Sequence, residues 1–530
     1  MTESSSQSNT DLQHVATNDE THGRARIMLQ LPVSIGVFAC ILMCITIVLV
    51  FYARSLAPTI NGPQRKTVTT AAVMASPPGY VEPTLIQSQT AIPVSNPGVT
   101  SSANAISDIK HTITPVVVFS ATSPATFDAG TAPVKPANSI PVTINTDAQD
   151  TASQLRIFDD LWQIVNDDYL YTNFNGLDWP EVQISTEKQI RAGMTFTQFY
   201  RLMDSVMTSL NDGHSYFLSP QQAKDEEKDY QGSGEYVGIG VITDINKQKQ
   251  YAYVLQVLPN SPAQRAGIRA HDHIIAINEQ PSVDAQGQTY IALLRGLVGT
   301  SVTVTVQTPG ATPHDLVMLR ENLPTQDPVE YRILTDTSRI GYILIPTFFE
   351  ETMADQVRTA LNALSKGGLL KGLIIDMRIN NGGSYPVLLT SLGFFTGGTI
   401  GYMEDRHGVR LAVTPPTEHT GNLLKVPLVV LIGPATESYA EVFAGALQAN
   451  GRASLVGQKS AGNIETLHGY DFEDGSEAWI AEETFHLPNG GNWEGKGLTP
   501  DIIVDRNWDD YPSNQDPVIA TAVQVITGSR

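Results

Sequence analysis

Residues 31–53, LPVSIGVFACILMCITIVLVFYA, contain no charged side chain. At about 1.5 Å per residue, a helix of this length can cross the ~30 Å hydrocarbon layer of a bilayer. The stretch therefore predicts a single transmembrane helix, and the alternative is a cleaved signal peptide. Arg24 and Arg26 precede the span and Arg54 follows it, which favours a cytoplasmic N-terminus.

The segments on either side of this span do not have the composition of folded domains. Residues 1–30 are mostly polar, and we expect a disordered cytoplasmic tail. Residues 54–150 are rich in Pro, Thr, Ser, Val and Ala without a helical period, which predicts an extended linker. The two cysteines of the chain, Cys40 and Cys44, lie inside the apolar span, so the rest of the chain has no thiol nucleophile, disulfide or thiolate metal site.

The charge balance excludes one class of partner. The chain has 530 residues, 33 Lys and Arg against 54 Asp and Glu, and a net charge of −21. Nucleic-acid binding needs clustered basic residues, and the sequence has no basic block. We expect no metal or cofactor either: the HDH at 271–273 is interpreted as solvated side chains at a turn, and the glycine-rich GSGEYVG lacks the helix and lysine of a nucleotide loop.

Two stretches carry apolar residues at three- and four-residue steps, which predicts amphipathic helices. They lie within residues 151–228, a predicted N-terminal helical segment, and comprise Leu155, Phe158, Leu161, Trp162, Val165 and Tyr169, then Phe196, Phe199, Tyr200, Met203, Val206, Met207 and Leu210. The second stretch ends in LNDGHSYFL, where Asn211, Asp212 and Gly213 stop the helix. This leaves His214 on a turn, from which it can reach a neighbouring domain.

In residues 229–310 the sequence pattern changes from helical spacing to short runs of strand-forming residues. GIGV, followed by VLQVLPNSPAQRAGIRAHDHIIAINEQPS, resembles a PDZ domain of the bacterial periplasmic type. The resemblance implies that a peptide carboxylate is held by backbone N–H groups of one loop, while a free strand edge pairs with the peptide. That loop comprises Tyr236, Val237, Gly238, Ile239 and Gly240. The alternative is a β-sandwich of unknown purpose.

Residues 325–510 alternate strand and helix patterns, which predicts an α/β layer architecture, and residues 511–530 are left as a C-terminal tail. Sheets of this kind place their chemistry at the carboxyl ends of the strands. Two unusual loops follow strands here, DMRINNGGSYP and GPATESYAEVFAGALQANGR.

The second of these loops contains a candidate nucleophile. Ser438 follows a strand and opens a helix, so its oxygen lies near unsatisfied helix N–H groups, and the Tyr439 N–H can bind an oxyanion. Gly382 and Gly383 in the first loop allow a second N–H to approach the same oxygen. A serine at this position can also be a simple N-cap.

Three segments, DMRINNGG, SYAEVFAGALQANGRASLVG and WEGKGLTPDIIV, are similar to landmark segments of the S41 peptidases, the family of C-terminal processing proteases and tricorn-like proteases. With the helical segment and the PDZ match, the likeness covers roughly residues 155–510. The resemblance implies an α/β catalytic domain of the ClpP/crotonase-like type, preceded by the PDZ domain.

The chain departs from the commoner pattern of that family. C-terminal processing proteases pair the serine with a lysine, but the aligned residue here is Asn463, whose amide cannot take a proton, and Lys459 lies four residues earlier. The tricorn-like branch uses serine, histidine and glutamate. That likeness implies Ser438 as nucleophile, His214 as base and Glu494 as the carboxylate that orients it, with Asn463 as a supporting hydrogen-bonding group.

We therefore expect a serine endopeptidase anchored in a bacterial cell membrane by residues 31–53, with its catalytic part outside the cytoplasm. Its substrates are exported polypeptides whose C-terminal tails bind the PDZ domain. The alternatives are a catalytically inactive PDZ scaffold, which binds such tails without cutting them, and an esterase with the same catalytic groups.

Overall fold

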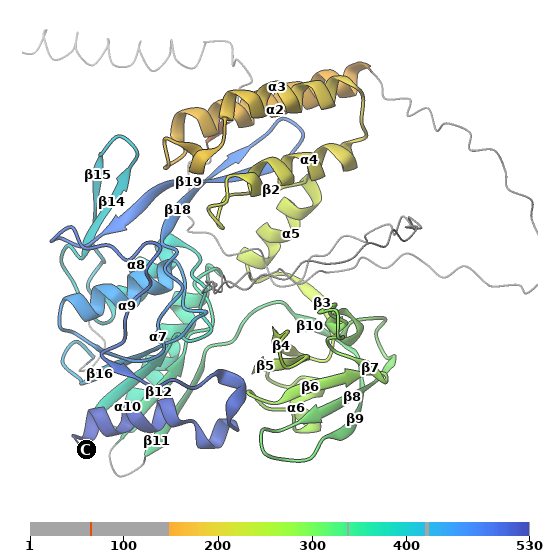
Figure 1. Ribbon diagram of the computed structural model, residues 1–530. Coiled ribbons are helices and arrows are strands. Elements are labelled where there is room, and N and C mark those ends of the chain that lie inside the picture. The colour runs from red at the N-terminus through yellow and green to blue at the C-terminus, as the bar shows by residue number, and fades with distance from the viewer. Residues whose placement is uncertain (1–63, 66–147, 336–338, 419–422, 529–530) are drawn as a thin grey trace, which may run out of the picture. The chain divides into compact units, whose positions relative to one another are not determined.

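The computed structural model describes residues 64–65, 148–335, 339–418 and 423–528 (Figure 1). The predicted cytoplasmic tail (1–30) and the predicted transmembrane helix (31–53) lie outside these residues, and so does most of the predicted linker (54–150). Among the helices that are described, none combines the length and the apolar character needed to cross a bilayer.

The first described helices form an α-helical layer. They are α2 (Ala148–Asp168), α3 (Trp179–Arg191), α4 (Phe196–Ser209) and α5 (Pro220–Tyr230), with the short strand β2 (Tyr216–Leu218) between the last two. Helices α2 and α4 confirm the two predicted amphipathic helices. Their apolar faces bury Phe158, Leu161, Phe199 and Met203 in one core around Trp179.

The next unit is the expected β domain. Its sheet has the order β4-β5-β6-β8-β9, with β7 paired to β6. The bounds are β4 (Val241–Asn246), β5 (Tyr251–Val257), α6 (Pro262–Ala266), β6 (His273–Ile277), β7 (Gln280–Pro281), β8 (Ser301–Gln307) and β9 (His314–Leu319). A separate two-stranded ladder pairs β3 (Glu235–Gly238) with β10 (Glu321–Pro324).

Two details of this domain differ from the prediction. The predicted end at residue 310 falls between β8 and β9, which pair as a hairpin, so the unit continues through β10. Within the predicted carboxylate loop, Gly240 has φ +85° and turns the chain between β3 and β4. A Cβ at Gly240 would lie 2.2 Å from the Cβ of Ser261, so the turn also needs a residue without a side chain.

The last unit confirms the predicted α/β layers. Its central sheet runs β11-β12-β13-β16-β17-β20, parallel except for the antiparallel β11. The bounds are β11 (Glu330–Thr335), β12 (Ile340–Leu344), α7 (Met353–Ser365), β13 (Gly372–Asp376), α8 (Tyr385–Gly393), β16 (Leu428–Ile432), α9 (Tyr439–Ala449), β17 (Ser454–Gly457) and β20 (Ile502–Ile503). Alternate strand residues face opposite layers: Ile375 and Val430 share a core with α7, α8 and α9, while Ile374 and Val429 share one with the C-terminal helix.

A second sheet joins this domain to the helical layer. Strand β19 (Glu477–His486) pairs with β18 (Glu465–Asp471), with β14 (Gly401–Asp405) and with β2 of the helical layer. Strands β15 (Arg410–Val413) and β1 (Gln64–Arg65) lie at its edges. Because β2 follows His214 directly, this pairing fixes where the histidine turn lies relative to the α/β domain.

The prediction of a C-terminal tail at 511–530 is wrong for most of that segment. Residues 517–527 form helix α10 (Pro517–Thr527), capped by Asp516, which accepts hydrogen bonds from the N–H groups of Val518 and Ile519. Val518 and Ala522 are buried against the central sheet. Figure 1 shows the helix beside that sheet. The helix covers a sheet face that would otherwise be exposed, so it belongs to the domain.

The interpretation of residues 271–273 as solvated side chains is also wrong. His271, Asp272 and His273 are buried. His271 Nδ1 lies 2.6 Å from the carbonyl oxygen of Trp508 and His273 Nε2 lies 2.8 Å from that of Asp509. Burial lowers the pKa of His271 to about 4. The motif is therefore a contact between the β domain and the segment before α10, and its partner is too distant in sequence for local patterns to reveal.

The same segment surrounds a buried cation. The Arg378 guanidinium lies 2.6 Å from the Asp376 carboxylate and 2.7 Å from that of Asp516. It donates to the Tyr511 hydroxyl at 3.0 Å and lies 4.7 Å from the Trp508 ring centroid. Arg378 thus links the end of β13 to the N-terminus of α10.

We expect Arg378→Met to reduce the free energy of unfolding by about 3–5 kcal/mol, because it leaves two carboxylates buried without their cation. Arg410→Met is the control, since Arg410 forms an exposed ion pair with Glu404, and it should cost less than about 1 kcal/mol. Urea denaturation of both variants measures the difference. Equal losses would contradict a structural role for the Arg378 cluster.

Candidate active site

Ser438 lies at a strained turn between β16 and α9. Its backbone has φ 56° and ψ −127°, a conformation that a residue with a side chain rarely adopts. The residue is fully buried, and its Oγ has no hydrogen-bond partner among the described residues. A strained turn from a strand to a helix that presents an uncommitted hydroxyl is the arrangement of a nucleophile elbow.

The glycines of the predicted oxyanion loop approach this serine closely. A Cβ at Gly382 would lie 2.7 Å from the Ser438 Cβ and 3.1 Å from the Tyr439 nitrogen. The Gly382 N–H already donates to Asn380 Oδ1 at 2.9 Å. The Tyr439 and Gly383 N–H groups have no acceptor within the described part of the chain. Of the three predicted oxyanion donors, the N–H groups of Tyr439 and Gly383 can therefore still donate to an oxyanion, whereas the Gly382 N–H already donates to Asn380.

A buried carboxylate holds the elbow in place. Glu441 Oε1 accepts the Ser460 hydroxyl at 2.5 Å and the Gly462 N–H at 2.8 Å. Its Oε2 accepts the Asn463 N–H at 2.9 Å and the Ser438 N–H at 3.2 Å. Burial raises the pKa of Glu441 to about 7, although its hydrogen bonds oppose the shift. Sequence reasoning missed this residue, but Ser438 and Glu441 form an S-x-x-E pair, the capping-box signature of a helix N-terminus.

His214 reaches this region from the helical layer. Asp212 Oδ1 accepts the N–H groups of both His214 and Ser215 at 2.8 Å, which fixes the turn after α4. The Ser215 Oγ accepts the Ala481 N–H of β19 at 3.0 Å. A Cβ at Gly213 would lie 3.7 Å from Asn463 Nδ2, which places the turn beside the loop that Glu441 holds.

The His214 imidazole is fully buried between two carboxylates. Its Nδ1 lies 3.0 Å from Glu465 Oε2 and its Nε2 lies 3.6 Å from Glu437 Oε1. The ring is not aligned for a hydrogen bond to either carboxylate, so these are close ionic contacts. Burial disfavours the charged ring, but Glu437 and Glu465 together outweigh that penalty and raise the pKa of His214.

The other two predicted residues lie around this cluster. The backbone carbonyl oxygen of Asn463 accepts the Ser438 N–H at 2.9 Å, and its side-chain Nδ2 donates to Glu437 Oε1 at 2.8 Å. Glu494 Oε2 accepts the Ile464 N–H at 2.7 Å and makes no ion pair with His214. Burial and the nearby charge of Glu465 raise the pKa of Glu494 to about 8.

The structure thus brings Ser438, Asn463 and His214 into one buried cluster, and Glu437 and Glu465 are members that sequence reasoning missed. Glu437 was detectable as the neighbour of Ser438. Glu465 carries no local signal, because it is the first residue of a strand, β18, that contains no recognisable motif. The Ser438 Oγ and the His214 ring are not in hydrogen-bond contact in this structure.

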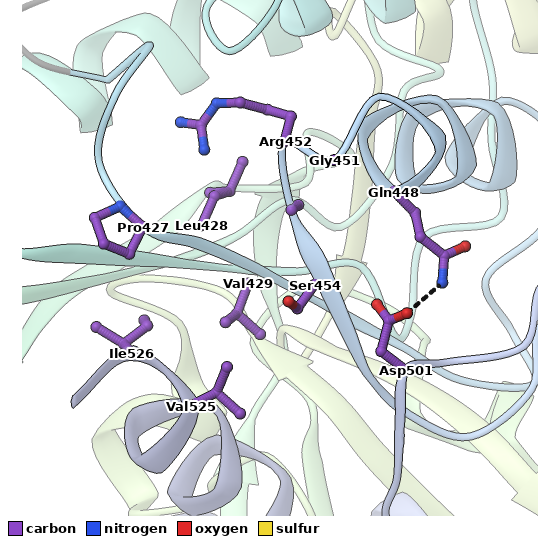
Figure 2. Close-up of a pocket in the computed structure, with 11 residues that line it drawn as sticks. Pro427, Leu428, Val429, Gln448, Gly451, Arg452, Ser454, Asp501, Val525 and Ile526 are labelled. Atoms are coloured by element: carbon purple, nitrogen blue, oxygen red, sulfur yellow. Dashed lines mark hydrogen bonds between the residues drawn. The ribbon is translucent and has the colours of Figure 1, made fainter. Parts of the chain in front are cut away.

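A cavity of about 460 Å³ lies elsewhere on the α/β domain (Figure 2). It lies at the amino ends of β16 and β17, where Leu428 and Ser454 begin those strands, and beside Val525 and Ile526 of α10. Ser438 follows the opposite, carboxyl end of β16. The cavity contains none of the predicted catalytic residues, and we assign it no part in the chemistry.

Comparisons with known families agree with this arrangement. Residues 151–208 match the tricorn protease C1 domain, residues 253–308 match the PDZ domain, and residues 339–504 match peptidase family S41.

Known relatives match over most of their length. The carboxyl-terminal-processing protease of Picosynechococcus sp. is 29% identical over 367 residues, covering 68% of this chain and 84% of the relative. The chloroplastic C-terminal processing peptidase of Tetradesmus obliquus is 27% identical over 378 residues, covering 68% and 79%. A crystal structure described as an S41 protease from Bacteroides fragilis shares the fold at 14% identity, with a TM-score of 0.50, over 70% of this chain and 97% of that one. Residues 339–504 match peptidase family S41 and residues 253–308 match the PDZ domain, so the chain is a serine-type peptidase that carries a PDZ domain.

Proposed function

We propose that this peptidase cuts polypeptides with Ser438 as nucleophile and His214 as general base. The supporting observation is the position of the buried His214 ring, which contacts the carboxylate of Glu437, the residue directly before Ser438. No lysine occupies the position of the usual base, since Asn463 stands there. In this proposal the imidazole takes the place of that lysine as general base.

In this mechanism the Ser438 Oγ attacks the peptide carbonyl carbon while its proton moves to His214 Nε2. The carbonyl oxygen becomes an oxyanion and accepts the N–H groups of Tyr439 and Gly383. The imidazolium then protonates the leaving amine as the C–N bond breaks. Water, deprotonated by the same imidazole, hydrolyses the acyl-enzyme and regenerates the serine.

The serine and the imidazole must come together for this step. In the unliganded structure the Glu437 carboxylate lies on the Nε2 side of the ring, at 3.6 Å. Catalytic hydrogen bonds are often long before substrate binds and tighten in the complex. We infer that bound substrate displaces Glu437 from Nε2, so that the Ser438 Oγ takes its place.

A fluorophosphonate probe tests the nucleophile. Ser438→Ala should abolish labelling, and His214→Gln should slow it by about two orders of magnitude or more, because the hydroxyl loses its base. Ser384→Ala is the matched control, since Ser384 is also fully buried at a helix N-terminus with an unpartnered Oγ, and it should label like the parent. An unlabelled parent protein would favour the inactive scaffold that binds tails without cutting them.

We propose further that the PDZ domain captures the C-terminal tail of the substrate. Strand β4 pairs only with β5 in the described residues, so its other edge is free to take an added strand. Tyr236, Val237 and Gly238 belong to strand β3 rather than to a loop as predicted, and the turn at Ile239 and Gly240 leads directly into β4. The Arg295 guanidinium lies 4.7 Å from the Tyr236 ring centroid and adds a positive charge where a terminal carboxylate would bind.

Two versions of one unfolded peptide substrate test this proposal, one ending in a free carboxylate and one in an amide. Losing a charge-assisted hydrogen bond costs about 1.5–3 kcal/mol, so we expect the amide to raise KM at least about tenfold while kcat changes little. Equal KM values for the two peptides would contradict tail capture.

We also propose that residues 31–53 anchor the enzyme in the cell membrane with the catalytic part outside the cytoplasm. The support is the uncharged stretch of 23 residues, which matches the thickness of a bilayer.

Alkaline carbonate extraction of membranes tests the anchor. The full chain should stay with the membrane pellet, and a variant that starts at residue 54 should move to the supernatant, because it lacks the apolar span. Release of the full chain by carbonate would contradict the anchor.

A further inference from the structure

The contact between His214 and Glu465 was not expected from the sequence. Glu465 is the first residue of β18 and is 2% exposed. Its Oε2 and the His214 Nδ1 are 3.0 Å apart, and neither atom has a hydrogen-bond partner elsewhere in the described residues. Two buried polar atoms that face each other in this way have only each other to satisfy them.

A tyrosine from the helical layer holds the other oxygen of the same carboxylate. The Tyr171 hydroxyl donates to Glu465 Oε1 at 2.5 Å. Burial raises the pKa of Tyr171, so the phenol keeps its proton and remains a donor. The N–H of the preceding Leu170 donates to the Ala481 carbonyl of β19 at 2.8 Å, which fixes this part of the chain against the sheet. Oε1 is thereby occupied, and Oε2 is left to face His214.

We propose that Glu465, set by Tyr171, is the positioning residue that holds the His214 ring at Nδ1 and leaves Nε2 to accept the Ser438 proton. This inference rests on the proposed roles of Ser438 and His214. A carboxylate on Nδ1 selects the tautomer with its proton on that nitrogen and stabilises the imidazolium that forms during attack.

Glu494, the carboxylate that the sequence assigned to this role, is placed differently. It accepts the Ile464 N–H at 2.7 Å and forms no ion pair with His214. Burial and the neighbouring charge of Glu465 raise its pKa, which makes it a weaker partner than Glu465 for an imidazolium. We assign Glu494 to bracing the backbone beside Glu465.

The pH dependence of cleavage follows from the groups around the ring. The charged or titratable groups that face it or its turn are Glu437, Glu465, Glu494, Asp212 and Tyr171. The carboxylates favour the imidazolium, and the base form appears only as pH rises through the raised pKa of His214. Removing the Glu465 charge lowers that pKa, so the rise of kcat/KM with pH should move to lower pH.

The experiment compares Glu465→Gln, Glu465→Asp and Glu494→Gln in the full chain, with fluorescently labelled casein as substrate over a range of pH. We expect Glu465→Gln to lower kcat at least about 100-fold and to shift the acidic limb to lower pH. Glu465→Asp should recover part of kcat, because it keeps the charge. Glu494→Gln should lower kcat much less than Glu465→Gln does, because Glu494 bonds the Ile464 N–H and forms no ion pair with His214.

The opposite ranking would overturn the proposal: a large loss in Glu494→Gln together with an unchanged limb in Glu465→Gln. If Glu465→Gln does not fold, Tyr171→Phe provides a second test. Without the Tyr171 hydroxyl the carboxylate can turn away from Nδ1, which removes its charge from the ring. This should lower kcat and shift the limb in the same direction, and an unchanged limb would again overturn the proposal. If the Ser438→Ala or the His214→Gln variant cleaved the substrate at the wild-type rate, the proposed function itself would be refuted. The two failures can therefore be told apart.

Discussion

The buried carboxylate of Glu441 organises the active-site end of the α/β domain. Its two oxygens accept four hydrogen bonds, from Ser438, Ser460, Gly462 and Asn463. At the start of α9 this side chain accepts the Ser438 N–H, and it joins the nucleophile turn to the loop that carries Asn463. The strained backbone of Ser438 can persist because the surrounding bonds determine its position.

The proposed catalytic groups come from two layers that are distant in the sequence. Ser438 follows a strand of the parallel sheet, whereas His214 follows a helix of the N-terminal layer. Strand β2 joins these layers by pairing with β19, and Asp212 fixes the histidine turn beside that strand. The same second sheet carries Glu465, so one β-sheet sets both the ring and the carboxylate that faces it.

Local patterns predicted most of the elements. Apolar spacing identified α2 and α4, and strand-helix alternation identified the α/β domain. Ser438 and His214 were identified through the family resemblance, aided by turn signals at both positions. The errors have one cause: residues 271–273 and 511–530 were interpreted without their partners. His271 packs against Trp508, 237 residues later in the chain, and α10 packs against strands of the central sheet that precede it by many residues.

The sequence by itself determined the helix and strand periods, the strand-to-helix turn at Ser438 and the absence of a lysine at position 463, because these depend on neighbouring residues. Only the tertiary structure decided that Glu465 rather than Glu494 contacts His214 and that Glu437 lies on the Nε2 side of the ring. It also decided that the Gly382 N–H donates a hydrogen bond to Asn380. The physical reason is that side-chain direction, burial and ionic contact depend on how separate layers pack, and residue order does not encode that packing in any local pattern.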